Sequence, residues 1–143
     1  MILVDVNLLI YATFEITPQH RAARTWIESK LSGTDRVGLP WHCLLGYLRI
    51  ATNPRAFSGA LTMADAWQQI EDWLACDPVW IPQPTERHAD TLSALLAQAP
   101  VHGNLVSDAH LAALAIEHGL TLCSSDGDFA RFRELKWHNP LLP

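Results

Sequence analysis

Four apolar residues at the start of the chain, Met1 to Val4, run without interruption into the acid Asp5. A short continuous apolar run of this kind is typical of a parallel strand that helices cover on both faces. Asp5 then stands at the carboxyl end of the strand, the edge at which open α/β sheets bind ligands. The same acid, or Asn7, also suits the N-cap of a helix that starts near Leu8, so a structural and a functional interpretation are both open.

Helical patterns alternate with short apolar runs along the rest of the chain. Apolar spacing predicts strands and helices over these ranges: strands at 36–39, 79–81 and 120–123, helices at 18–31, 41–52, 62–74, 85–96 and 104–118. Thr17, Thr62 and Thr85 are predicted N-caps, Gly119 is a predicted helix end, and Trp137 belongs to a predicted edge strand. Because parallel strands need helical crossovers, this order predicts an α/β fold, a three-layer α/β/α arrangement around a central parallel sheet. Residues 1–143 are expected to form a single domain.

Composition narrows the class of protein. Apolar residues make up 49% of the chain and charged residues 17%, which excludes a disordered chain. The formal net charge of −5 argues against coating of nucleic acid by bulk electrostatics, although a few arginines can still recognise RNA locally. The apolar runs are too short for a membrane span and the start lacks signal-peptide features, so a cytoplasmic protein is expected. Cys43, Cys76 and Cys123 are predicted to be buried free thiols.

Acidic residues recur where the predicted elements meet the carboxyl edge of the sheet. Asp5 follows the first strand, Asp108 lies near the head of a helix, and Asp126 and Asp128 follow the strand at 120–123. Taken singly, a helix-dipole role for Asp108 or a turn role for the last two is as probable as a functional one. Taken together, carboxylates in one crevice repel one another unless a cation is present. Mg²⁺ or Mn²⁺ is the natural cation, and hydrolysis of a phosphodiester is a reaction that such a site supports.

Four stretches carry a resemblance to a known family: LVDVNLLIYA at 3–12, GYLRIATNPR at 46–55, NLVSDAHLAALAIEHG at 104–119 and LCSSDGDFARF at 122–132. With these stretches the chain resembles the PIN-domain ribonucleases, and specifically the VapC toxins of bacterial type II toxin-antitoxin pairs. The resemblance is essentially full length. It implies a PIN fold, a Mg²⁺- or Mn²⁺-dependent endoribonuclease that inhibits translation and growth, a homodimer, and inhibition by a cognate VapB-like antitoxin.

The resemblance also implies roles for particular residues. Asp5, Asp108 and Asp126 match the metal-binding acids of the family, and Asp128 matches a further acid near the site. The supporting or substrate-binding positions match Asn7, Arg49 and Ser124.

One position departs from the family pattern. Gly46 stands where the family usually has a glutamate as its second acid, three residues before Arg49. Either fewer carboxylates hold the metal, or activity is weakened and the chain is a PIN-like module that binds RNA or protein. His42, one helical turn earlier, is a candidate to lean into the gap. A third hypothesis is an aspartate-nucleophile phosphatase resembling the haloacid dehalogenases, but Asn7 replaces the acid that this family needs and only Lys136 follows the last acids.

The remaining aromatic and basic residues complete the expectations. The faces predicted to be buried include Trp26, Trp41, Leu45, Met63, Trp67 and Leu96, whereas Trp73 and Trp80 are candidates for a partner or dimer surface. Plausible phosphate contacts are Arg21, Arg24, Arg49 and Arg55. Apart from His42, the histidines show no zinc-binding spacing, and none of these others is expected to bind a metal.

Overall fold

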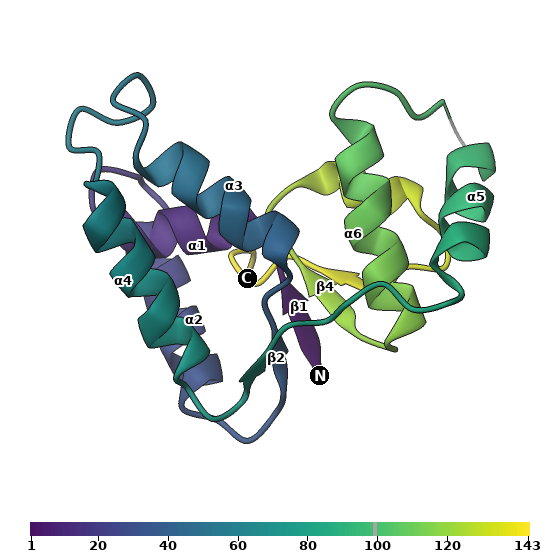
Figure 1. The fold of residues 1–143 in the computed structure, drawn as a ribbon, viewed down its shortest axis with the longest axis horizontal. Coiled ribbons are helices and arrows are strands. Elements are labelled where there is room, and N and C mark those ends of the chain that lie inside the picture. The colour runs from purple at the N-terminus through teal and green to yellow at the C-terminus, as the bar shows by residue number, and fades with distance from the viewer. Residues whose placement is uncertain (99) are drawn as a thin grey trace.

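A computed structural model describes residues 1–98 and 100–143 and shows alternating strands and helices (Figure 1). The strands are β1 (Ile2–Val4), β2 (Val37–Gly38), β3 (Val79–Trp80), β4 (Thr121–Cys123) and β5 (Trp137–His138). The helices are α1 (Val6–Thr13), α2 (His20–Leu31), α3 (Trp41–Ala51), α4 (Met63–Leu74), α5 (His88–Gln98) and α6 (Leu105–Glu117), with the short 3-10 helix η1 (Gly127–Arg131).

The five strands form one sheet in the order β3-β2-β1-β4-β5, and all pairings are parallel. The central strand β1 pairs with β4 so that Val4 lies opposite Cys123. The chain therefore leaves both strands at the same edge of the sheet, where Asp5 and Ser124 follow. This register is what brings acids that are more than a hundred residues apart in sequence to one place.

Helices cover both faces of the sheet, as the predicted α/β/α arrangement requires. Figure 1 shows α1 to α4 on one side of the strands and α5 and α6 on the other. Successive residues of a strand point to opposite faces, and accordingly Val4 joins the core beneath the first group whereas Leu3 joins the core beneath the second. The prediction of a parallel sheet covered on both faces is confirmed.

Several predicted helix boundaries are confirmed and two are wrong. The Thr62 side chain accepts a hydrogen bond from the amide of Asp65 and caps α4, and Gly119 ends α6 with a φ of +67°, a conformation that favours glycine. Thr17 does not cap α2, because its hydroxyl donates to the carbonyl oxygen of Phe14 within a turn and the helix begins at His20. Thr85 likewise lies before α5, and its hydroxyl donates to the carboxylate of Glu117 instead.

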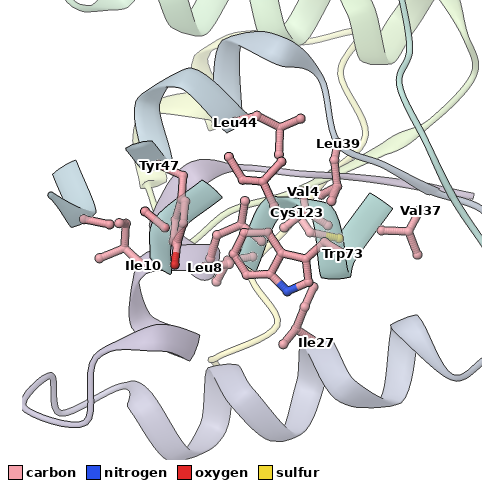
Figure 2. Close-up of a cluster of buried hydrophobic side chains, with 14 of the residues drawn as sticks. Val4, Leu8, Ile10, Ile27, Val37, Leu39, Leu44, Tyr47, Trp73 and Cys123 are labelled. Atoms are coloured by element: carbon pink, nitrogen blue, oxygen red, sulfur yellow. The ribbon is translucent and has the colours of Figure 1, made fainter. Parts of the chain in front are cut away.

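The buried faces of α3 and α4 differ from the predicted ones. The exposed side chains include four on faces predicted to be buried: Trp41 (37% exposed), Leu45 (58%), Met63 (56%) and Trp67 (41%). Trp73, a candidate for a partner surface, is only 6% exposed. Its indole lies among the core side chains over Ile27 (Figure 2), and its ring centroid is 4.8 Å from that of Tyr47. The prediction for Leu96 is also wrong, since that side chain is 40% exposed while its neighbour Leu95 is buried.

The structure also shows the surroundings of the cysteines and the character of the helices. Cys43 and Cys123 are buried free thiols, as predicted, and Cys76 is partly buried. None of the helices in the described part of the chain combines the length and the apolar character that crossing a membrane requires.

Candidate metal centre

Asp5 occupies two roles at the end of β1. Its Oδ1 accepts a hydrogen bond of 2.8 Å from the amide of Val6 and so caps α1. Its Oδ2 accepts a hydrogen bond of 2.7 Å from the hydroxyl of Ser124, the residue that follows β4. The capping interpretation therefore describes one oxygen of Asp5 correctly, and the other oxygen is tied to the neighbouring strand.

Ser124 is the residue on which this part of the sheet edge converges. Its side chain is fully buried, and its Oγ accepts hydrogen bonds from the amide of Asp126 at 3.0 Å and from the Nδ2 of Asn7 at 3.1 Å. Together with the bond to Asp5, these contacts join the ends of β1 and β4. The hydroxyl thus holds Asp5, Asn7 and Asp126 in a fixed relation to one another.

Three further carboxylates lie at the same edge. Asp108, Asp126 and Asp128 each offer one oxygen, and these oxygens lie within 4.8 Å of one another. Asp108 comes from the first turn of α6, whereas Asp126 caps η1 by accepting a hydrogen bond of 2.9 Å from the amide of Asp128. The side chains of Asp108 and Asp126 are half-buried and that of Asp128 is exposed. We call Asp108, Asp126 and Asp128 the carboxylate cluster.

The pKa of Asp108 shows that this crowding of negative charge is unfavourable. Burial and, after it, the negative charges of Asp126, Asp5 and Asp128 together raise this pKa to about 6. Burial also raises the pKa of Asp5, to which the charge of Asp126 contributes, although the hydrogen bonds from Ser124 and Val6 act in the opposite direction. Four carboxylates near one another without enough positive charge are the electrostatic signature of a cation site.

The donor set fits a hard divalent cation. The ligand atoms that converge are carboxylate oxygens, which such cations prefer over nitrogen or sulfur. In addition, Oδ1 of Asn7 is buried and has no hydrogen-bond partner among the described residues. A buried acceptor without a partner costs free energy, so an ion or its water ligands would satisfy it. The edge of the sheet can therefore hold a metal ion.

Arg131 is a member of this site that the sequence patterns did not single out. Its Nε donates to the carbonyl oxygen of Asp128 at 3.0 Å, and its Nη2 lies 3.4 Å from the Oδ1 of the same residue. Its charge opposes the rise in the pKa of Asp108. The available signal was its spacing, three residues after Asp128, because in a helical turn residues i and i+3 lie on one face.

Gly46, Arg49 and His42 lie beside the carboxylate cluster rather than within it. They line a separate cavity together with Val6 and Leu45. Among the described residues, the side chains with converging ligand atoms do not include His42, whose ring instead packs against that of His110 with centroids 5.7 Å apart. Lys136 precedes β5 and so lies at the opposite edge of the sheet from the acids.

A second polar network joins α5 to α6 and includes the histidines His88 and His110. The Glu117 side chain is fully buried and accepts hydrogen bonds from the amide and hydroxyl of Thr85, and its other oxygen bonds to Nδ1 of His88. The Nε2 of His88 lies 3.1 Å from the Nδ1 of His110. Burial disfavours ionisation of Glu117, but the bonds from Thr85 and His88 outweigh it and lower the pKa. Because α6 is otherwise largely apolar, its sequence pattern did not indicate that Glu117 is buried.

Comparison with known proteins points to one family. Residues 2–135 match the family described as PIN domain. Ribonuclease VapC37 of Mycobacterium tuberculosis is 42% identical over 140 residues, which cover 98% of this chain and 97% of that protein. Ribonuclease VapC43 of the same species is 38% identical over 141 residues, with 99% and 96% of the two chains covered.

Solved structures with the same fold are more distant in sequence. VapBC2 from Rickettsia felis, bound to a DNA fragment from its promoter, superposes with a TM-score of 0.70 at 17% identity, over 97% of this chain and 98% of the other. FitAB bound to a DNA fragment superposes with a TM-score of 0.69 at 20% identity, over 100% and 97%. At these identities the comparison shows a shared fold.

Proposed function

Because this chain belongs to the PIN domain family and, within it, to the VapC ribonucleases, we propose that it is the toxin of a type II toxin-antitoxin pair and a metal-dependent endoribonuclease. The observation that carries the metal dependence is the convergence of Asp108, Asp126 and Asp128 within 4.8 Å, next to Asp5. Asp5, Asp108 and Asp126 hold Mg²⁺ or Mn²⁺, and Asp128 supports them. Hydrolysis of RNA in the cytoplasm by this site inhibits translation and growth.

The residues of the chain divide the work by position. Held by Asp5, Asp108 and Asp126, a divalent ion would offset charge on the scissile phosphate and would lower the pKa of an attacking water. Ser124 keeps Asp5 oriented through the bond of 2.7 Å between its hydroxyl and Oδ2. Asn7 contributes a buried amide oxygen beside the same pair, and Arg131 balances part of the negative charge from Asp128. Arg49 is exposed on α3 and supplies a phosphate contact.

Partners form part of the same proposal. The VapC resemblance gives the chain a VapB-like antitoxin, a homodimeric state and an RNA substrate. In support of a protein interface, Trp41 and Trp67 are partly exposed and stack with ring centroids 6.4 Å apart on neighbouring helices. Exposed aromatic side chains of this kind are enriched where proteins meet.

Cleavage of RNA by the purified chain tests the proposed function. The wild type should cleave RNA with Mg²⁺ or Mn²⁺, excess EDTA should stop the reaction, and Asp5→Asn should abolish both cleavage and growth inhibition in a host. Asp35→Asn is the matched control, since Asp35 is exposed in a turn before β2. Cleavage that persists in EDTA and in Asp5→Asn would refute a reaction at this site.

The glycine at position 46 favours a second candidate, a PIN-like module that binds RNA or protein with little catalysis. It removes the acid that the family usually has, so the remaining carboxylates must suffice. Calorimetric titration with Mn²⁺ separates the two candidates. Binding at millimolar Mn²⁺ or below supports the ribonuclease, whereas the lack of any binding heat supports the module.

The raised pKa of Asp108 predicts that metal affinity depends on pH. Because that pKa is about 6 in the metal-free protein, the carboxylate is protonated at pH 5 and must lose its proton when the ion binds. We expect the apparent Kd for Mn²⁺ to rise about tenfold between pH 7 and pH 5, as one proton competes with the ion. Calorimetry in buffers of different ionisation enthalpy measures both the affinity and the protons released. A flat profile over this range would show that Asp108 is not a ligand.

A further inference from the structure

Packing does not require the glycine at position 46. A Cβ built there would lie 3.4 Å from Cγ2 of Val6, which is ordinary van der Waals contact. Gly46 also lies inside α3, where glycine is about 1 kcal/mol less favourable than alanine. A small residue at this position therefore calls for an explanation other than the fit between α3 and α1.

A cavity lies at this position, beside the carboxylate cluster. Val6, His42, Leu45, Gly46 and Arg49 line a space of about 260 Å³. Two observations fix its place. Val6 directly follows Asp5 in the chain, and the ring of His42 packs against that of His110, on the helix that carries Asp108. A side chain at position 46 would enter this space. We call it the Gly46 pocket.

The lining of the Gly46 pocket suits a flat ring attached to an anion. Val6 and Leu45 give apolar contact, while His42 and Arg49 bring planar nitrogen-bearing groups. Among the described residues no carboxylate lies within 4.0 Å of the Arg49 guanidinium, so its charge is available to a ligand in a chain of net charge −5. RNA-binding sites commonly hold unstacked bases between such groups, with phosphates on arginine.

Size limits the occupant further. Pockets for drug-sized ligands span roughly 300–1,000 Å³, so a space of about 260 Å³ suits one ring system and not a whole nucleotide. Without a bound cation, the neighbouring carboxylates repel a phosphate. With a cation bound, the phosphates would lie at Arg49 and the metal centre, and the base would occupy the pocket.

We infer that the Gly46 pocket receives one nucleobase of the RNA strand beside the cleaved phosphate, with Arg49 on an adjacent phosphate. The inference rests on the proposed function, because it names a subsite of the same ribonuclease. Position 46, where the family usually has a glutamate as its second acid, thus contributes to substrate recognition in this chain instead of metal binding.

The direct test fills the pocket with Gly46→Leu. Titration of the ¹⁵N-labelled protein with the four nucleoside 5′-monophosphates, in EDTA, should shift the amide signals of Val6, Leu45 and Gly46 in the wild type. Gly46→Leu should weaken binding about tenfold or more, in line with the effect of removing a base-stacking contact. Its thermal stability should stay equal or rise, because leucine is the better helix former. Equal shifts with inorganic phosphate alone would overturn base recognition.

Gly59→Leu is the matched control for the same chemical change. Apart from its two chain neighbours, a Cβ at Gly59 would meet no atom of residues 1–98 or 100–143 within 4 Å, and the residue lies in the loop before α4. This variant should bind nucleotides as the wild type does. If Gly59→Leu weakens binding as much as Gly46→Leu, the pocket is not the site.

A cleavage assay separates failure of the inference from failure of the proposed function. Oligonucleotides with a single abasic position should lose about tenfold or more in kcat/KM at one position next to the cut, the scale expected for one stacked base. Gly46→Leu should be insensitive to that substitution. A wild type that cleaves but shows neither an abasic penalty nor nucleotide-induced shifts overturns the inference and leaves the ribonuclease intact. If the wild type cleaves nothing, the proposed function fails, and the nucleotide titration alone decides whether the pocket binds a base.

Discussion

Replacing Asp108 by asparagine is expected to abolish RNA cleavage while making the metal-free protein more stable. Asp108→Asn removes one converging oxygen charge from the carboxylate cluster. Loss of groups that merely orient metal ligands costs about 10–100-fold in affinity or activity, so loss of a ligand should lower kcat/KM by at least about 100-fold. Calorimetry with Mn²⁺ and an RNA cleavage assay measure the two losses.

The gain in stability follows from the sign of the pKa shift. The pKa of Asp108 is about 6 in the folded protein against an ordinary value of 3.8, so the folded state binds the proton more tightly than the unfolded state does. Its favourable contribution is fully present below pH 3.8 and is lost as the pH rises through about 6. At pH 7.5 without metal, Asp108→Asn should therefore melt a few degrees higher than the wild type.

Two controls test the expected gain in stability. Asp35→Asn makes the same change at an exposed acid and should alter neither the melting temperature nor cleavage. Saturating Mn²⁺ should raise the melting temperature of the wild type but not that of Asp108→Asn. A variant that melts lower than the wild type in EDTA at pH 7.5 would show that Asp108 stabilises the fold and is not held there against repulsion.

The largest expected loss of stability comes from Trp73→Ala. Trp73 is 6% exposed and packs edge-to-face against Tyr47 within the core between α2, α3 and α4 (Figure 2). Truncation of a buried tryptophan typically costs 3–5 kcal/mol through lost burial and the cavity left behind, so we expect a decrease of about 4 kcal/mol in the free energy of unfolding. Urea denaturation followed by circular dichroism measures it.

Trp67→Ala is the matched control on the same helix. Trp67 is 41% exposed and stacks on Trp41, so its removal should cost only about 0.5–1.5 kcal/mol in the monomer. Similar losses for the two variants would contradict the packing of α4 described here.

These two tryptophans show where the sequence pattern was insufficient. The predicted buried stripe of α4 runs through Met63, Trp67 and Ile70, whereas the observed one runs through Ala66, Ile70 and Trp73. Consecutive residues in a helix are about 100° apart, so the two stripes share Ile70 but face different directions around the helix axis. In α3 the observed stripe also includes Cys43 and Tyr47 in place of Trp41 and Leu45. Periodicity identifies a helix, but which side faces the core depends on its neighbours.

The arrangement of the acids combines both kinds of information. The order of apolar runs and acids determined a parallel α/β fold with Asp5, Asp108 and Asp126 toward one edge of the sheet, because strand ends and helix heads are local features. Only the tertiary structure shows that the oxygens within 4.8 Å of one another belong to Asp108, Asp126 and Asp128. It also shows that Asp5 bonds to Ser124. The pairing of β1 with β4 joins segments more than a hundred residues apart, and η1, which Asp126 caps, then places Asp128 beside Asp126.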